Sequence, residues 1–285
     1  MKIFKDFELS NFNSYKIKSK CAFAYFPESE NDFIELFSTL KGKKYIVIGN
    51  GNNVILSKSY YNIPFVILNG FFDRITLNES YIEAEAGATT FNLSKFALEN
   101  SLTGAEFLYD IPSSIGGAVV MNAGTKEGET KNILHKVRYL DLNDLNIKEK
   151  LNSEIDLSYR DSYFQNNKDA IILKVWFRLE QGEQDKIESL MKESKKRRWS
   201  KQPREFPNCG SVFKRPPGRF VGPMLDELGL KGFSIGGAQV SEKHSGFIVN
   251  KGEATGEEIL TLIKEIQRRV KDKFDVELEI EQRVI

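Results

Sequence analysis

The sequence predicts an α+β protein with two domains. The chain has 285 residues, which is more than a single hydrophobic core commonly stabilises. Strand patterns dominate the first two thirds without strict strand–helix alternation, which argues against a doubly wound parallel sheet. The last third combines strands with two long helical patterns. We expect the domains at 1–184 and 185–285, because the chain turns polar at residues 181–184 before a helical stretch begins.

Periodicity predicts the N-terminal elements in order. A helix begins after Ser29, where apolar residues recur on one face and Asp32 stands at the capping-box position as a shorter substitute for Glu. The apolar face comprises Phe33, Leu36, Phe37 and Leu40. Strands follow over residues 45–48, 55–61, 65–68 and 81–86, then a helix over 91–99 and strands over 137–142 and 171–179.

The C-terminal third carries the strongest helical signal. After a helix over 185–199 and a strand over 245–249, Thr255 and Glu258 form a capping box. An apolar stripe then runs through Ile259, Leu262, Ile263, Ile266 and Val270. A last strand is predicted over 276–280, with Glu277, Glu279 and Glu281 on its outer face.

Composition excludes several classes of function. Lys and Arg total 41 against 40 for Asp and Glu, so no charge imbalance indicates a nucleic-acid or membrane partner. No apolar run approaches the ~20 residues of a membrane helix. Two histidines without clustered ligands argue against a metal site. Cys21 and Cys209, without a secretory signal, indicate reduced thiols in a cytoplasmic protein, which we expect to be a monomer.

Two loops rich in small residues are candidates for binding phosphate. Ile111–Gly124 combines a proline with glycines that permit close approaches, and Gly49–Val54 has similar character. Together they could clamp a pyrophosphate, because such loops aim backbone N–H groups at an anion. The alternative is a buried turn packed against a sheet. A Rossmann fingerprint is excluded, because Val54 occupies the position of its third glycine and a strand pattern follows where the fingerprint needs a helix.

Three further segments could carry chemistry. Arg160 beside Tyr159 could clamp a carboxylate, or it could be a surface residue paired with Asp161. Ser211 lies in a turn rich in Pro and Gly, without the pattern of a hydrolase nucleophile elbow. Glu281 is either functional or a solvent-facing strand residue.

Taken together, these segments resemble one family almost from end to end. The sequence is similar to the UDP-N-acetylenolpyruvoylglucosamine reductases (MurB), flavoenzymes of bacterial cell-wall synthesis. The resemblance rests on Asn13-Ser14-Tyr15, Gly49–Asn53, Ile111–Gly124, Tyr159–Ser162, Lys201-Gln202-Pro203, Cys209–Gly218, Lys231–Gly237, His244–Asn250 and Val276-Glu277-Leu278.

The resemblance implies the fold and the chemistry. It implies an FAD-binding fold of the vanillyl-alcohol-oxidase (PCMH) type and a C-terminal α+β substrate domain. FAD would be bound non-covalently, NADPH would reduce it, and hydride would pass to C3 of UDP-N-acetylglucosamine enolpyruvate, giving UDP-N-acetylmuramate for peptidoglycan. By the family pattern Ser211 protonates C2, while Arg160 and Glu281 assist at the carboxylate. Whether Glu281 donates a proton or orients the substrate stays open.

The family pattern also implies binding residues. The cofactor residues would be Gly49, Asn50, Gly51, Asn52, Asn53, Gly87, Ile111, Pro112, Ser113, Ser114, Gly116, Gly117, Ala118, Asn122 and Gly124. The residues contacting substrate or nucleotide would be Tyr159, Lys201, Arg215 and His244, with Lys201 facing the diphosphate.

The sequence departs from the family pattern at three places. Ser19-Lys20 and Ser113 replace usual glycines, and the span from Arg160 to Ile171 is short. The short span indicates the compact branch of the family, which lacks the substrate-covering Tyr loop. Two other functions remain open: a related FAD oxidase or dehydrogenase for another small substrate, and a nucleotide-binding module without turnover.

Overall fold

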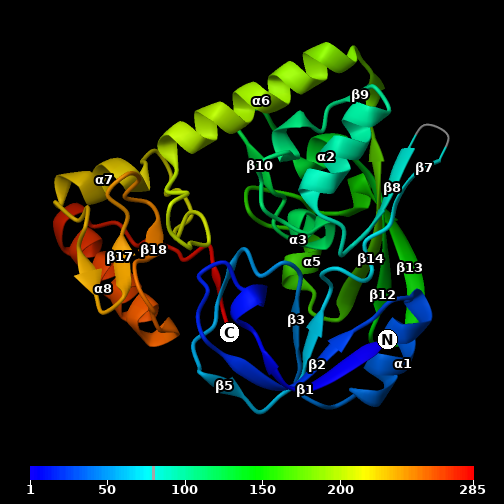
Figure 1. Ribbon diagram of the computed structural model, residues 1–285, viewed down its shortest axis with the longest axis horizontal. Coiled ribbons are helices and arrows are strands. Elements are labelled where there is room, and N and C mark those ends of the chain that lie inside the picture. The colour runs from blue at the N-terminus through cyan, green and yellow to red at the C-terminus, as the bar shows by residue number, and fades with distance from the viewer. Residues whose placement is uncertain (79–80) are drawn as a thin grey trace. The chain divides into compact units, whose positions relative to one another are not determined.

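The computed structural model describes residues 1–78 and 81–285. Within them the chain forms two compact units, each built from separate segments. Unit 1 comprises Met1–Phe4, Ala24–Asn50 and Pro64–Arg198, and unit 2 comprises Lys5–Phe23, Gly51–Ile63 and Trp199–Ile285. Strands β1 (Lys2–Glu8) and β2 (Lys20–Phe26) pass from one unit into the other. The mixture of helices and strands is the α+β content that the sequence predicts (Figure 1).

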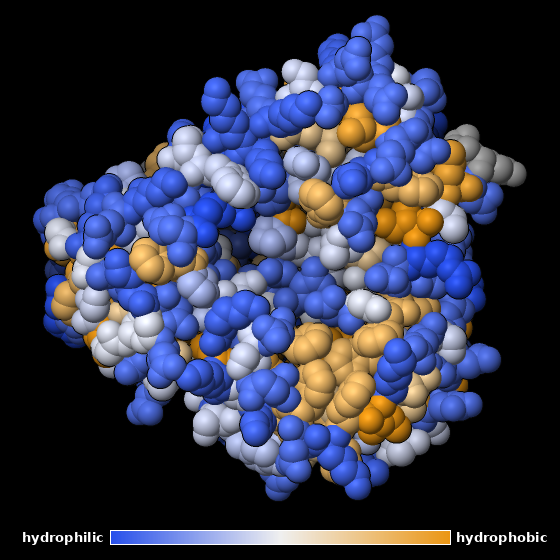
Figure 2. Space-filling view, viewed as in Figure 1, coloured by the Kyte–Doolittle hydropathy of each residue, from blue (hydrophilic) through white to orange (hydrophobic). Residues whose placement is uncertain are grey.

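These units do not follow the expected division at 184/185. Helix α6 (Gln184–Lys201) matches the predicted helix over 185–199, but all of it up to Arg198 belongs to unit 1. Two ion pairs hold its C-terminal half there, Arg197–Glu127 at 2.6 Å and Arg198–Asp110 at 3.4 Å. The helix is polar around most of its circumference, and hydrophilic residues dominate its surface in Figure 2. The break between units therefore falls at the end of the helix.

One sheet of unit 1 is antiparallel, in the order β13–β12–β14–β8–β7. Its strands are β7 (Ile75–Asn78), β8 (Tyr81–Glu85), β12 (Leu134–Asp141), β13 (Asn146–Leu151) and β14 (Ala170–Arg178). The predicted strands over 81–86, 137–142 and 171–179 are confirmed. β7 and β13 were not predicted, because they lie at the edges of the sheet and bury little apolar surface.

A parallel group of strands completes the sheets of unit 1. β6 (Phe65–Ile67) pairs with β3 (Ile46–Ile48) on one side and with Ala24 and Tyr25 of β2 on the other. Two short antiparallel pairs lie elsewhere in the unit: β9 (Leu102–Thr103) with β15 (Glu180–Gln181), and β10 (Gly124–Thr125) with β11 (Gly128–Glu129).

The helices of unit 1 are mostly short. They are α1 (Glu30–Thr39), α2 (Thr90–Glu99), α3 (Ile115–Val120), α4 (Thr130–Ile133) and α5 (Tyr163–Asn166), with 3₁₀ turns at Glu106–Leu108 and Asn152–Glu154. The predicted helices at 29 and 91 are confirmed. The capping at α1 differs from a full box: Ser29 accepts from the amide of Asp32, but Asp32 accepts from the amide of Glu28 rather than that of Ser29.

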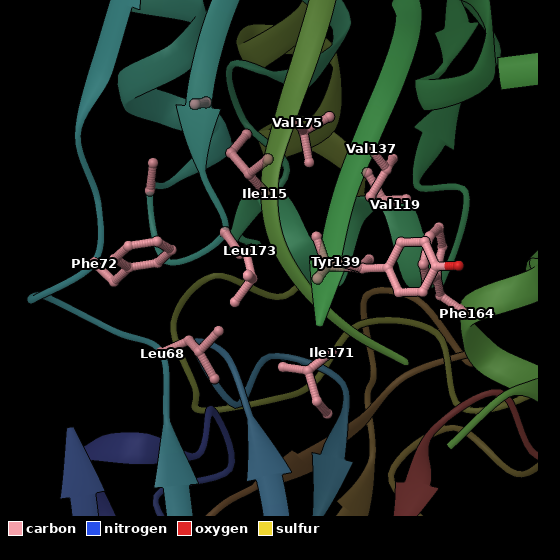
Figure 3. Close-up of a cluster of buried hydrophobic side chains, with 14 of the residues drawn as sticks. Leu68, Phe72, Ile115, Val119, Val137, Tyr139, Phe164, Ile171, Leu173 and Val175 are labelled. Atoms are coloured by element: carbon pink, nitrogen blue, oxygen red, sulfur yellow. The ribbon is translucent and has the colours of Figure 1, made fainter. Parts of the chain in front are cut away.

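One apolar core holds unit 1 together. Figure 3 shows side chains from β12, β14, α3 and α5 pointing into it, among them Val137, Tyr139, Leu173 and Phe164. Ile115 and Val119 of α3 lie four residues apart, so both face this core, and both are fully buried. Helix α3 is thus anchored through one face.

Unit 2 contains a small antiparallel sheet and the longest helix. The sheet orders β16 (Ser234–Ile235), β17 (Ala238–Val240) and β18 (Ile248–Asn250), and the helices are α7 (Val221–Glu227) and α8 (Gly256–Phe274). α8 confirms the capping box of Thr255 and Glu258, and its predicted apolar stripe is buried. Parallel pairs join β4 (Val54–Ile55) to β19 (Arg283–Val284), and β5 (Tyr60–Tyr61) to Lys20 and Cys21 of β2. A 3₁₀ turn covers Ser10–Phe12.

Three predicted strands are wrong in extent. The strand over 55–61 is two short strands, β4 and β5, because each pairs with a different partner. The strand over 245–249 begins only at Ile248. The strand over 276–280 shrinks to one bridge between Ile280 and Phe213, because the partner segment runs into Pro216 and Pro217, which cannot continue a ladder. Leu278 is still buried with Glu277 and Glu279 exposed, so the predicted faces are confirmed.

Candidate functional site

The loop at 111–114 ends in helix α3, which the sequence did not predict. Ser114 is its N-cap, and its Oγ accepts from the amide of Gly117 at 3.2 Å. The amides of Ile115 and Gly116 donate to the carbonyl oxygens of Ala88 and Ala86, at 2.7 and 2.9 Å. These three amides are therefore occupied by acceptors within the protein. The cap residue and the preceding loop remain as the candidate contact.

Close contacts explain two glycines of the predicted cofactor set, with a side chain at Gly49 and with backbone at Gly87. β3 ends at Ile48 and brings Gly49 against the N-cap of α3, so that a Cβ on Gly49 would lie 2.1 Å from Ser114 Oγ. A Cβ on Gly87 would lie 2.5 Å from the carbonyl oxygens of both Leu68 and Phe72. A larger side chain at Gly87 would therefore clash with fixed backbone, and one at Gly49 would displace the Ser114 hydroxyl.

The carboxamides of the Gly49–Asn53 loop fit a ligand with hydrogen-bond donors. Within the described residues, Oδ1 of Asn50 and Oδ1 of Asn52 are buried and have no hydrogen-bond partner. An unsatisfied buried acceptor costs about 1–3 kcal/mol. Hydroxyl, amine or imide N–H groups, all of which FAD carries, would satisfy them. Asn52 Nδ2 donates to Ser14 Oγ at 2.5 Å, and Asn53 Nδ2 donates to the carbonyl of Glu281 at 3.2 Å, which orients both side chains.

Arg160 lies at the tip of a tight turn in unit 1. Ser158 and Asp161 form an antiparallel bridge, with Tyr159 and Arg160 between them. Arg160 has φ of 54° in the left-handed region, and its guanidinium donates to the carbonyl oxygens of Asn122 at 3.4 Å and Gly124 at 3.2 Å. It also lies 5.2 Å from the ring centre of Tyr159, which is 43% exposed.

The partners of Asp161 do not support the surface-pair interpretation of Arg160. The Asp161 carboxylate accepts from the amide of Ser162 and from Asn166 Nδ2. Between this turn and β14 the chain forms only α5, which agrees with the compact span.

Ser211 and Glu281 lie on neighbouring segments of unit 2. The amide of Glu281 donates to the carbonyl of Val212 at 2.9 Å, next to Ser211 in the chain. Ser211 is exposed, whereas Glu281 is partly buried and is not part of a regular strand. The backbone segments that carry these two predicted catalytic residues therefore lie side by side in unit 2.

Gln282 is a buried residue that sequence reasoning missed. Its Nε2 donates to the carbonyl oxygens of Cys209, Gly210 and Ser211, at 3.2, 3.4 and 3.3 Å, and its Oε1 accepts from the hydroxyl of Tyr15 at 3.0 Å. It therefore holds the backbone segment that carries Ser211. The available signal was Tyr15 in the Asn13-Ser14-Tyr15 motif, which needs a distant polar partner when buried.

The remaining predicted substrate residues all belong to unit 2. Lys201 and Arg215 are exposed, and the Arg215 guanidinium lies 5.2 Å from the ring centre of Phe220. His244 is partly buried, and its Nδ1 accepts from the amide of Gly246 at 3.2 Å. Burial lowers the pKa of His244, although Asp226 acts in the opposite direction. The imidazole is therefore neutral near pH 7, with a proton on Nε2.

Two buried cysteines do not form a disulfide in the described residues. Burial raises the pKa of the Cys209 thiol to about 12, and its Sγ lies 3.4 Å from the carbonyl oxygen of Val54. Among residues 1–78 and 81–285, no group of three potential ligands from His, Cys, Asp and Glu could hold a metal ion. None of the described helices is long and apolar enough to cross a membrane.

The chain is similar to known FAD-binding proteins. An FAD binding domain model matches residues 22–145, which include Gly49–Asn53, Gly87 and the whole segment 111–124. The chain is thus a flavoprotein.

The relatives define the family. A model of the C-terminal domain of UDP-N-acetylenolpyruvoylglucosamine reductase matches residues 202–285. The reductase of Caldanaerobacter subterraneus is 41% identical over 100% of this chain and 94% of its own length. That of Fervidobacterium nodosum is 42% identical over 98% and 90%. The crystal structure of the reductase (MurB) from Thermus caldophilus matches with a TM-score of 0.82 and 28% identity, over 99% of this chain and 98% of the other. The chain belongs to the UDP-N-acetylenolpyruvoylglucosamine reductase family of FAD-dependent oxidoreductases.

Proposed function

We propose that the protein reduces UDP-N-acetylglucosamine enolpyruvate to UDP-N-acetylmuramate, with NADPH as the reductant. The observation that carries this proposal is family membership along the whole chain, together with an FAD binding domain. The buried, unpartnered oxygens of Asn50 and Asn52 support a bound FAD. When bound, FAD supplies hydride transfer from the nicotinamide to the substrate.

Arg160 is proposed to stabilise the charge that develops on the substrate. Addition of hydride to C3 of the enolpyruvyl group moves an electron pair onto C2 and the adjoining carboxylate. A guanidinium held in place before the reaction stabilises that charge, an effect worth about 3–4 kcal/mol for one such donor. The carbonyl oxygens of Asn122 and Gly124 hold this guanidinium and support the role.

Ser211 is proposed to deliver the proton that completes the reaction at C2. A hydroxyl is a weak acid, so it must be held close to the carbanion and be reprotonated by neighbours. Gln282 fixes the backbone at Ser211, and Glu281 is on the adjoining segment. Glu281 is proposed to assist Ser211 and the substrate carboxylate.

The remaining substrate and cofactor contacts are proposed from the family pattern alone. Tyr159, Lys201, Arg215 and His244 are proposed to contact substrate or nucleotide. The cofactor contacts are proposed for Gly49–Asn53, Gly87, residues 111–118 and Gly124. The family pattern also includes Asn122, but its carboxamide is already bonded within the protein. We also propose that the protein is cytoplasmic, since its buried thiols suit a reducing compartment. We further propose that it is a monomer.

Half-reactions test the proposal. The purified yellow protein should bleach with NADPH under anaerobic conditions, and UDP-N-acetylglucosamine enolpyruvate should restore the colour much faster than oxygen does. Ser211→Ala should bleach normally and lose the restoration, because only the second step needs a proton at C2. Rapid reoxidation by another small substrate would instead assign a different oxidoreductase, and absence of bleaching would indicate a module without turnover.

A further inference from the structure

We propose that Asn122 positions Arg160 for the second half-reaction, and this rests on the role proposed above for Arg160. Asn122 follows helix α3 and is completely buried, although the family pattern assigns it to the cofactor. Its contacts lead to the turn that carries Arg160. Asn122 is therefore assigned as a positioning residue of unit 1.

The side chain of Asn122 holds the base of that turn. Its Nδ2 donates to the carbonyl oxygen of Ser158 at 2.9 Å and to Glu129 Oε2 at 3.1 Å, and its Oδ1 accepts from the amide of Lys131 at 3.0 Å. Both amide hydrogens are thus used, and the oxygen has a partner. The carboxamide is occupied by the protein, so the side chain serves the fold around Arg160 in preference to a ligand.

The backbone of Asn122 holds the other end of the arginine. Its carbonyl oxygen accepts from Arg160 Nη1, and that of Gly124 accepts from Nη2. Asn122 has φ of 40°, in the left-handed region that asparagine tolerates better than most residues. This backbone conformation places the carbonyl oxygens of 122 and 124 where one guanidinium reaches both.

Asn122 therefore contacts Arg160 at two separated points, the base of its turn through Ser158 and the guanidinium itself. The backbone of Arg160 also has a left-handed φ, which is unfavourable for a residue other than glycine. Such a residue keeps its conformation only where the surroundings determine it. Removing the contacts of Asn122 should therefore displace the guanidinium while leaving its charge unchanged.

Two substitutions at Asn122 separate its side chain from its backbone. Asn122→Asp keeps the size but replaces two donors with an acceptor facing the Ser158 carbonyl and the Glu129 carboxylate. Asn122→Gly keeps the left-handed φ and removes the side-chain bonds. The control is Asn250→Asp in unit 2, a buried asparagine whose Nδ2 donates to the Tyr15 carbonyl and whose Oδ1 accepts from the amides of Gly252 and Ala254.

The experiment measures FAD content, bleaching by NADPH and reoxidation by UDP-N-acetylglucosamine enolpyruvate in each purified holoprotein. Asn122→Asp should keep FAD and bleach at nearly the wild-type rate, but its reoxidation should slow about 10- to 100-fold, as expected for a displaced catalytic group. Asn122→Gly should slow the same step by a smaller factor. Asn250→Asp should lower thermal stability without this selective loss. In an Arg160→Ala background, Asn122→Gly should have no further effect on reoxidation.

Several results would overturn the proposal. Wild-type reoxidation in both Asn122 variants, or effects that multiply with those of Arg160→Ala, would show that Asn122 does not act through Arg160. Loss of FAD from both variants would assign Asn122 to cofactor binding instead. If the wild-type protein bleaches but the enolpyruvyl nucleotide does not reoxidise it, the proposed function fails as well, which distinguishes that failure from one confined to Asn122.

Discussion

Substitution of Gly49 by alanine should destabilise the start of helix α3 through a single contact. The new Cβ would lie 2.1 Å from Ser114 Oγ and 3.1 Å from Ser114 Cβ, so the cap side chain must move. Loss of the cap costs about 1 kcal/mol, and crowding of a packed site costs about 1–3 kcal/mol. Alanine also lowers the conformational entropy of the unfolded chain relative to glycine, which offsets about 0.4–1 kcal/mol of this loss. We expect a net destabilisation of about 2 kcal/mol for Gly49→Ala in urea unfolding of the FAD-depleted protein.

A second substitution checks the cause. Ser114→Gly removes both clashing atoms, and glycine is tolerated at an N-cap for a few tenths of a kcal/mol. The double variant should therefore recover most of the stability lost by Gly49→Ala, with a coupling of about 1–2 kcal/mol in the double-mutant cycle. Additive losses would refute the assignment of the effect to Ser114. So would an unchanged midpoint for Gly49→Ala alone.

Three further predictions concern single side chains. Arg160→Lys should bleach with NADPH but slow reoxidation by about 10²- to 10³-fold in stopped flow, because an ammonium cannot reach two carbonyl oxygens as a planar guanidinium does; rates equal to wild type would contradict the role. The pKa of His244 is lowered in the folded protein, so its contribution to stability is complete above pH 6.5 and is lost as the pH falls through the folded pKa. Urea titrations from pH 5 to 8 should accordingly show a smaller acid loss for His244→Gln, and identical slopes would exclude this effect. Gln282→Leu should lower the free energy of unfolding by about 2–3 kcal/mol, because it leaves the buried hydroxyl of Tyr15 without its partner. Adding Tyr15→Phe should restore part of the thermal stability. A double variant with no such rescue would argue against the bond between Tyr15 and Gln282.

Elements with a strong local signal were predictable from the sequence. Helix α8 combines a capping box with a buried stripe, and β8 alternates buried and half-exposed residues. β1 gives no such signal, because nearly all its residues are exposed. α3 contains Gly116 and Gly117, which disfavour helix, yet the cap at Ser114 and the burial of Ile115 and Val119 stabilise it.

The site was predictable only in part, for a related reason. Family motifs predict Arg160, Ser211 and Glu281, and the backbone segments that carry the last two are neighbours in unit 2. The residues that support them lie far away in sequence. The bond between Tyr15 and Gln282 spans 267 positions, and that between Asn122 and Ser158 spans 36. Neither separation leaves a periodic pattern, so only coordinates reveal these supports.

The pairing of β4 with β19 has a consequence for synthesis on the ribosome. Val54 emerges early, but its partner Arg283 is made roughly 230 positions later, which at ~5–20 residues per second means a wait of about 10–50 s. During that interval the apolar segment Val54-Ile55-Leu56, buried in the finished protein, has no native strand beside it. The nascent chain should therefore expose this apolar segment until its C-terminus is made, and slowed translation should lengthen that exposure.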